Sequence, residues 1–182
     1  MKSLLLSCAI AALGVSLLSI TATAQKKKPP VRQAPAKIIA NCPNSGLTDA
    51  EVAEILTAHN KARASVKVPL LRWDCTLGKE AADWVATGEA GHSDTSFGEN
   101  VFVSMTTDDS VKKAIDRWED EHHNWTNKTG ACATGKTCTH YTQMVWKSTG
   151  RIGCAINRNT TGKWKLMFVC NYDPSAQTGP AY

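Results

Sequence analysis

The chain contains 182 residues, of which 42% are hydrophobic and 20% are charged. This length suits one domain with a sizeable core, and the composition excludes a disordered chain, a collagen-like chain and a protein that crosses the membrane several times. The formal net charge is +5, but six of the 21 lysines and arginines lie before Cys42, in a stretch without acids. From Cys42 onward the chain contains the remaining 15 lysines and arginines and all 16 acids. The part expected to fold is therefore nearly neutral and lacks the basic surface of a nucleic-acid-binding protein.

The first 24 residues have the pattern of a secretory signal peptide. Lys2 is followed by an apolar run over residues 4–20 and by small residues at positions 22–24, the usual order of charged start, hydrophobic stretch and cleavage site. We predict cleavage after Ala24, which leaves no membrane segment in the mature chain. An uncleaved anchor is the alternative, because lysines follow at positions 26–28, but the run is short for a bilayer span. The protein is expected to be extracellular, or periplasmic in a Gram-negative bacterium.

Residues 25–41 and 42–182 differ in composition. The first segment is rich in lysine, proline, alanine and glutamine, which is typical of a disordered leader. The second is expected to be a single domain and contains six cysteines. An even number of cysteines in an oxidising compartment predicts three disulfides, whose connectivity the sequence alone leaves open. Zinc ligation is the alternative, but only Cys132 and Cys138 lie close together, and their spacing does not suit zinc.

Four segments carry helix signals. A capping box opens the first helix, expected over residues 48–64, and Asp74 is placed to cap a second over residues 76–88. The acids at positions 108–109 are expected to open a third helix, and a shorter fourth fits residues 140–147. The third helix is predicted to carry one apolar stripe of four residues: Val111, Ile115, Trp118 and Trp125.

Three segments are predicted to be β-strands, over residues 100–104, 152–157 and 164–172. One face of the last strand carries Trp164, Leu166, Phe168 and Tyr172, and the other face carries Met167 and Val169. A strand that is apolar on both faces belongs between two layers. The pattern therefore predicts an α/β protein, with helices on both sides of a small sheet.

Four ionisable residues occur in surroundings that a purely structural sequence would not give them. Glu121 follows Trp118 by three residues and so shares the apolar stripe of the third helix. Glu99 stands at the entrance to an apolar strand, His92 lies in the loop before it, and His140 opens the fourth helix. A buried carboxylate needs a cation, a metal or hydrogen-bond donors. Two histidines and two carboxylates could form one cluster, although periodicity does not show that they meet.

Three further histidines are expected to lie outside this set. His59 occurs four residues after Ile55, on the apolar face of the first helix, which indicates a core histidine. His122 and His123 have no motif support and are expected to be solvated. The chain contains no HExxH motif, since no histidine lies four residues before His123, and no serine or cysteine nucleophile with a paired base is recognisable. A metal-dependent secreted hydrolase or protease is the alternative function, and the absence of these motifs argues against it.

Several motifs occur together in a recognisable order. THYTQMVWKSTG at residues 139–150 and FVCNYDP at residues 168–174 resemble the two signatures of the CAP superfamily, and HNKAR at residues 59–63 resembles its HNxxR element. GHS and GENV, within residues 91–101, resemble the elements between them. The superfamily contains cysteine-rich secretory proteins, insect venom antigens and plant pathogenesis-related class one proteins. Over residues 47–172 the chain is most similar in pattern to the plant proteins.

This resemblance implies a fold and a site. The fold would be a three-layer α/β/α sandwich with a small, mainly antiparallel central sheet. The site would be a cavity lined by His92, Glu99, Glu121 and His140, in which His92 and His140 hold one divalent ion such as zinc. Two protein ligands make a weak, open metal site. A buried histidine–glutamate hydrogen-bond network without metal is the alternative.

The resemblance also implies a disulfide pattern. Cys132–Cys138 and Cys154–Cys170 match two bridges of the plant proteins. The third plant bridge uses a cysteine shortly after the position of Cys154, and residues 155–159 contain none. The cysteines that remain, Cys42 and Cys75, are expected to pair.

The function implied is that of a secreted, monomeric binding protein of host–microbe interaction or defence, whose partner is a sterol, a fatty acid, another lipid or an extracellular protein. The polar segment 126–136 lacks the aromatic loop that accompanies sterol binding in some members, which argues against sterols. Residues 170–182 resemble the terminus from which plant relatives release a signalling peptide. An ordinary mobile terminus is the favoured reading of that segment.

Overall fold

The computed structural model describes residues 41–182, so the predicted signal peptide and nearly all of the predicted leader lie outside the described residues. Its elements, in chain order, are α1 (Asp49–Ser65), β1 (Arg72–Trp73), α2 (Cys75–Thr87), β2 (Gly98–Ser104), α3 (Val111–Asp120), the 3₁₀ helix η1 (Glu121–Asn124), β3 (Trp125–Thr126), β4 (Ala131–Cys132), α4 (Thr139–Val145), β5 (Arg151–Asn157) and β6 (Leu166–Asp173). No helix among the described residues is long and apolar enough to cross a membrane.

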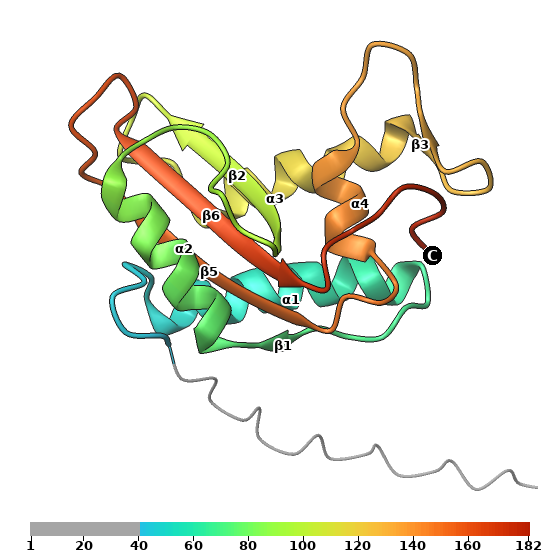
Figure 1. The fold of residues 1–182 in the computed structure, drawn as a ribbon, viewed down its shortest axis with the longest axis horizontal. Helices are drawn as coiled ribbons and strands as arrows, with labels where there is room; N and C mark the ends of the chain where they lie inside the picture. The colour runs from blue at the N-terminus through green and yellow to red at the C-terminus, as the bar shows by residue number, and fades with distance from the viewer. Residues whose placement is uncertain (1–40) are drawn as a thin grey trace, which may run out of the picture. The chain divides into compact units, whose positions relative to one another are not determined.

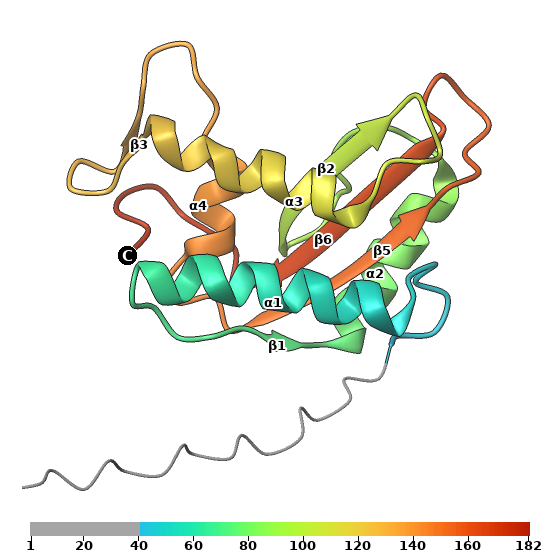
Figure 2. The same ribbon diagram turned by 180° about the vertical axis from the view of Figure 1, so that it is seen from behind.

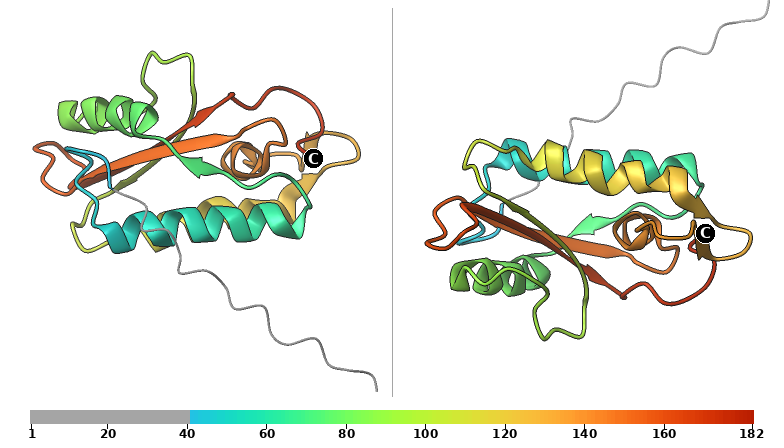
Figure 3. Two further views of the ribbon diagram at one scale, coloured as in Figure 1. Left: turned by 90° about the horizontal axis from the view of Figure 1, so that it is seen from below. Right: turned by 90° about the horizontal axis from the view of Figure 1, so that it is seen from above.

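The elements form three layers around a four-stranded sheet. The strand order is β1-β5-β6-β2, with β1 parallel to β5 and the other two pairings antiparallel. Helix α2 lies on one face of the sheet (Figure 1), and α1 and α3 lie side by side on the opposite face (Figure 2). The views along the layers show α2, the sheet and the α1–α3 pair in succession, with α4 beside the sheet (Figure 3). The predicted α/β/α sandwich with a mainly antiparallel sheet is confirmed.

Strand β6 contributes residues to two hydrophobic cores, one on each face of the sheet. Its residues Leu166, Phe168 and Tyr172 pack with α1, α3 and α4, while Met167 and Val169 pack with α2. All five side chains are at most 1% exposed. The strand is buried on both faces because helices cover both sides of the sheet, as its sequence predicted.

Helix α2 approaches the sheet closely because glycines face each other there. A Cβ atom added to Gly153 of β5 would lie 2.2 Å from the backbone nitrogen of Gly78 and 2.2 Å from the carbonyl oxygen of Asp74. A side chain at Gly153 would therefore push the start of α2 away from the sheet.

The helix starts follow the capping pattern only in part. The predicted capping box of α1 is present, with Thr48 Oγ1 accepting from the Glu51 backbone, and Asp74 caps α2. Helix α3 is capped by Ser110, whose hydroxyl accepts from the Lys113 nitrogen at 3.2 Å. The prediction that residues 108–109 open this helix was therefore wrong by one residue or two.

The third helix is also shorter than its apolar stripe predicted. Val111, Ile115 and Trp118 are buried on α3 as expected, but the α-helix ends at Asp120 and continues as η1. Trp125 lies in β3, paired with Cys132 of β4, so its match to the helical period was a coincidence of spacing. Glu121 starts η1. At the other end of the chain, Trp164 precedes β6 instead of lying in it.

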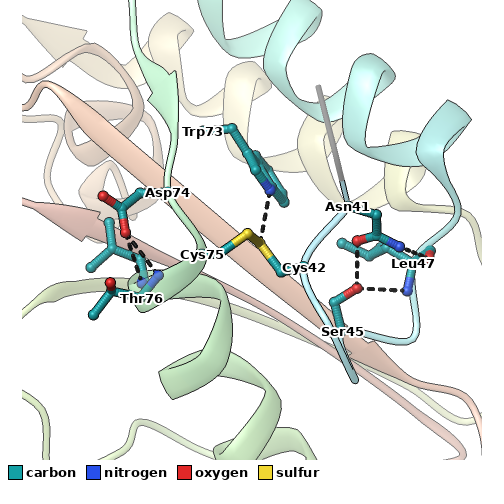
Figure 4. Close-up of a disulfide and its surroundings, with 9 residues drawn as sticks. Asn41, Cys42, Ser45, Leu47, Trp73, Asp74, Cys75 and Thr76 are labelled. Atoms are coloured by element: carbon teal, nitrogen blue, oxygen red, sulfur yellow. Dashed lines mark hydrogen bonds between the residues drawn. A yellow bond between two sulfur atoms is a disulfide. The ribbon is translucent and has the colours of Figure 1, made fainter. Parts of the chain in front are cut away.

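The six cysteines form the pairs Cys42–Cys75, Cys132–Cys138 and Cys154–Cys170, the same pairs that the resemblance led us to expect. The first joins the segment before α1 to the first residue of α2 (Figure 4), and the Trp73 indole donates a hydrogen bond to Cys42 Sγ at 3.0 Å. In the same view, Asn41, Ser45 and Leu47 form a hydrogen-bonded turn that leads into α1.

The segment after β6 is fixed at several points, contrary to the mobile terminus that its sequence predicted. The Ala176 nitrogen donates to Gln143 Oε1 at 2.8 Å, and the Lys147 nitrogen donates to the Ala181 carbonyl at 2.8 Å. Asn127 Oδ1 accepts from the Ala181 nitrogen at 2.7 Å. Because Ala181 is 1% exposed, this segment is part of the folded unit.

Candidate functional site

His92 and Glu99 form the first of two histidine–carboxylate pairs. His92 Nδ1 donates to Glu99 Oε1 at 3.0 Å, and the backbone nitrogen and hydroxyl of Ser93 donate to the same carboxylate at 2.9 and 2.6 Å. The Glu99 side chain is 4% exposed, whereas that of His92 is 64% exposed. The carboxylate is therefore buried with its oxygens hydrogen-bonded, and it holds an accessible imidazole at the surface.

His140 and Glu121 form the second pair. His140 Nδ1 donates to Glu121 Oε1 at 2.5 Å, and the ring stacks on Trp118 with centroids 6.0 Å apart. Glu121 Oε2 also accepts from the backbone nitrogens of His140 and Tyr141, at 3.0 and 3.1 Å. Those nitrogens lie in the first turn of α4, where backbone donors lack helical partners. Glu121 thus fixes both the imidazole and the helix that carries it.

Of the four residues predicted to line one cavity, His92 pairs with Glu99 and His140 pairs with Glu121, and only His92 and Glu99 line the pocket described below. Within residues 41–182, no group of three or more histidine, cysteine, aspartate or glutamate side chains is arranged to hold a metal ion. In each pair the hydrogen bond uses Nδ1, so Nε2 is the nitrogen left for a ligand. A carboxylate that fixes the ring through Nδ1 in this way is the usual partner of a metal-binding histidine.

A pocket of about 530 Å³ opens beside the first pair. Its lining residues come from the loop before β2, from β2, from α4 and from the segment after β6: His92, Ser93, Thr95, Phe97, Gly98, Glu99, Asn100, Thr139, Thr142, Gln143, Ser175, Ala176, Gln177 and Thr178. The sequence did not indicate that the last segment forms a wall. The proline and glycine content of that segment gave no sign of the backbone hydrogen bonds that hold it.

A buried hydrogen-bond chain connects α1 to the first turn of α4. Asn100 Nδ2 donates to the His140 carbonyl and to the Tyr172 hydroxyl, both at 3.1 Å. His59 Nδ1 donates to the Ile55 carbonyl at 2.8 Å, so His59 Nε2 accepts from the Tyr172 hydroxyl, also at 2.8 Å. His59 is fully buried, as predicted, and burial lowers its pKa to about 4. Its neutral ring therefore holds Tyr172 in place.

A second concavity, of about 390 Å³, lies between α1 and α3. Ala53 and Ala58 contribute apolar surface to it, above the buried Ile115, and the other lining residues are Glu54, Thr57, Lys61, Lys112, Asp116 and Glu119. Lys112 is paired with Asp116 at 2.6 Å, whereas Lys61 has no ion pair among the described residues. We call this concavity the α1–α3 groove. The apolar stripes of the two helices were predicted, but their side-by-side placement was not.

The exposed histidines His122 and His123 lie on η1, outside both pairs, and are solvated as the sequence indicated. Their rings contact each other with centroids 3.8 Å apart, and His122 Nδ1 donates to the Glu119 carbonyl at 2.8 Å. They therefore form no part of the site.

These features define a disulfide-linked α/β/α sandwich with two histidine–glutamate pairs. The model of the CAP family, described as the cysteine-rich secretory protein family, matches residues 56–172, and the chain belongs to this family. A pathogenesis-related protein of PR-1 type from Sambucus nigra is 37% identical over 127 residues, which cover 66% of this chain and 74% of that protein. The secreted protein RBT4 of Candida albicans is 35% identical over 153 residues, which cover 76% of this chain and 41% of that protein.

Solved structures share the same fold. Venom allergen-like protein 4 of Schistosoma mansoni is 25% identical with a TM-score of 0.63, over 75% of this chain and 95% of that one. The crystal structure of NaASP2 with Zn²⁺ is 22% identical with a TM-score of 0.64, over 78% of this chain and 88% of that one.

Proposed function

We propose that the protein is a secreted carrier or sequestering protein that binds a fatty acid or a similar anionic lipid in the α1–α3 groove. The observation that carries this proposal is the apolar surface of that groove beside Lys61, a cation without an ion pair among residues 41–182. Ala53 and Ala58 supply hydrocarbon surface, and Lys61 lies at the same concavity. An acyl chain would cover the apolar surface, and its carboxylate would pair with the lysine.

The size of the groove supports a small ligand. Its volume of about 390 Å³ lies within the range of about 300–1,000 Å³ that is typical of small-molecule sites. Glu54, Asp116 and Glu119 also lie along it. These acids would disfavour a ligand with several negative charges, so a single carboxylate fits better than a phosphorylated lipid headgroup.

The test is the binding of cis-parinaric acid, a fatty acid that becomes fluorescent in an apolar site. Ala58→Phe should fill the groove and abolish binding. Ala64→Phe, on the exposed end of the same helix and outside the groove, should bind like the wild type. Lys61→Gln should weaken binding by about fivefold, the value of one exposed ion pair. Equal affinity of wild type and Ala58→Phe would exclude this groove as the ligand site.

Secretion is supported by the signal-like residues 1–24 and by the three disulfides, which persist in oxidising compartments. Relatives point the same way, since RBT4 is named a secreted protein. Defence-related activity is proposed on the similarity to pathogenesis-related proteins.

A second candidate function is weak binding of a divalent ion by His92 and His140. The matched hydrogen bonds from each Nδ1 to a carboxylate favour it, and the related NaASP2 was solved with zinc. A bound ion would supply a Lewis acid, while Glu99 and Glu121 would orient the rings. We expect calorimetric zinc titration to give a heat that the His92→Ala/His140→Ala double variant lacks. The same heat from both proteins would leave the pairs as a purely structural hydrogen-bond network.

A further inference from the structure

The pocket beside His92 has walls of uniform chemical character. Apart from His92 and Glu99, its lining residues carry hydroxyl, amide or methyl groups or are glycines, with Phe97 as the one further ring. No lysine or arginine is among the described residues that line it. Small-ligand sites are usually mostly apolar with a few polar groups. A wall built mainly of neutral polar groups therefore suits a ligand whose own surface is polar and uncharged.

The one carboxylate in the pocket is already satisfied. Glu99 Oε1 accepts from His92 Nδ1 and from the Ser93 backbone nitrogen, and Oε2 accepts from the Ser93 hydroxyl. With three donors around it and a side chain only 4% exposed, Glu99 does not present a free charge to a ligand. A cationic ligand would find no open carboxylate here, and an anionic ligand would find no lysine or arginine.

Hydroxyl groups from separate segments surround the pocket. Thr139 begins α4, Thr142 lies one turn later, and Thr178 belongs to the segment after β6. Within the part of the chain that the structure describes, the hydroxyls of Thr139 and Thr178 form no hydrogen bond, and the Thr142 hydroxyl donates to the Thr139 carbonyl at 3.1 Å. Each hydroxyl can donate one hydrogen bond and accept two. Sugar hydroxyls have the same dual capacity, so they complement this wall.

Phe97 adds the apolar element that such a ligand requires. Its side chain is half-buried in the loop that leads into β2 and lines the same pocket. A pyranose ring has one face of C–H groups, which packs on an aromatic ring and removes apolar surface from water. The threonine hydroxyls around Phe97 therefore suit a sugar ring, whose edge is polar and whose face is apolar.

The walls are fixed in place before any ligand binds. Gln143 Nε2 donates to the Thr149 hydroxyl at 3.2 Å, and Gln143 Oε1 accepts from the Ala176 nitrogen at 2.8 Å. The Thr149 hydroxyl donates to the Pro174 carbonyl at 2.7 Å. Gln143 is 4% exposed, so these bonds are buried and hold the segment after β6 against α4. A prearranged site loses less conformational entropy on binding.

We propose that this pocket is a binding site for a neutral oligosaccharide, with Phe97 as the stacking platform and the hydroxyls of Thr139 and Thr178 as hydrogen-bonding partners. The site is separate from the α1–α3 groove, and it shares no lining residue with that groove. Success or failure of lipid binding therefore has no bearing on it.

The test is titration of the full mature protein with cellohexaose, N-acetylchitohexaose and laminarihexaose, three neutral β-linked hexasaccharides, followed by amide chemical shifts and calorimetry. EDTA is present throughout, so that no metal ion bridges His92 to the sugar. At least one of the three should bind at or below about millimolar concentration, with shifts centred on residues 93–100, 139–143 and 175–178. A heparin hexasaccharide, which carries many negative charges, should not produce these shifts.

Variants assign the contacts. Phe97→Ala should weaken binding by about tenfold through the lost stacking, and Thr139→Val and Thr178→Val by about threefold each through one lost hydrogen bond. Thr76→Val is the matched control, because Thr76 is also an exposed threonine in the first turn of a helix but lies outside the pocket. The proposal is overturned if no neutral hexasaccharide binds, if the shifts map elsewhere, if heparin alone binds, or if both threonine variants bind like the control.

Discussion

At the scale of single residues, His59 links stability to pH. Burial lowers its pKa from 6.5 to about 4, so the unfolded chain takes up a proton below pH 6.5 that the folded chain takes up only near pH 4. Stability contributed by the neutral ring is therefore complete above pH 6.5 and is lost as the pH falls toward 4. The shift corresponds to a loss of about 3 kcal/mol across that window.

We expect urea denaturation at pH 7 and at pH 4 to show this loss in the wild type and a smaller loss in His59→Gln. Carboxylates that titrate in the same range act in both proteins and cancel in the comparison. An identical pH dependence in the two proteins would mean that His59 is protonated as readily in the folded state as in the unfolded state.

At the scale of elements, Glu121 supports the first turn of α4. Its Oε2 accepts from two backbone nitrogens of that turn, and carboxylates at this end of a helix are stabilising. Glu121→Ala should lower the free energy of unfolding by about 1–2 kcal/mol, as the loss of a helix cap does. Glu119→Ala is the matched control, because that neighbouring side chain contacts neither α4 nitrogen, and it should change stability by less than about 0.5 kcal/mol.

Thermal or urea unfolding of the two variants measures the difference. A comparable loss in both would show that the acidic end of α3 acts through general charge and not through the contact with α4. Equal stability of Glu121→Ala and the wild type would remove the capping role altogether.

The elements also show how far local sequence determines structure. The starts of α1 and α2 were predictable because the caps Thr48 and Asp74 act through hydrogen bonds to nearby residues. The end of α3 was not, because the apolar spacing continued to Trp125 while the chain left the helix to pair β3 with β4. Strand β1 has only two residues and exists through its partner β5, so no local signal identified it.

The candidate site consists of contacts between residues far apart in the sequence, which local patterns do not predict. Glu121 and Trp118 could be placed on one face by counting, but the pairing of Glu121 with His140 joins residues 19 apart. The same holds for His59 and Tyr172, 113 residues apart. Only the resemblance to a known family indicated that Glu121 and His140 share a site, and nothing in the sequence indicated the contact between His59 and Tyr172. Neither the residue patterns nor the family resemblance predicted that the segment after β6 forms a wall of the pocket.

At the scale of the whole molecule, the disulfides stabilise the sandwich unequally. Cys42–Cys75 closes a separation of 33 residues and joins two layers, whereas Cys132–Cys138 closes a separation of 6 within one loop. If loop-closure entropy dominates, removing the longer bridge should cost about 1.5 kcal/mol more than removing the shorter. Paired cysteine-to-alanine variants, compared by urea unfolding, measure this, and a larger loss from the short bridge would show that local packing outweighs chain entropy.

For the whole molecule, we have proposed a secreted carrier with a ligand in the α1–α3 groove. The most direct measurement is native mass spectrometry of the protein secreted by a host cell, with lipid extraction of the same sample. We expect a mature chain that begins at Gln25, carries one lipid per protein in the wild type and in Ala64→Phe, and carries none in Ala58→Phe. A ligand-free spectrum of the wild type that no added fatty acid changes would contradict the claim.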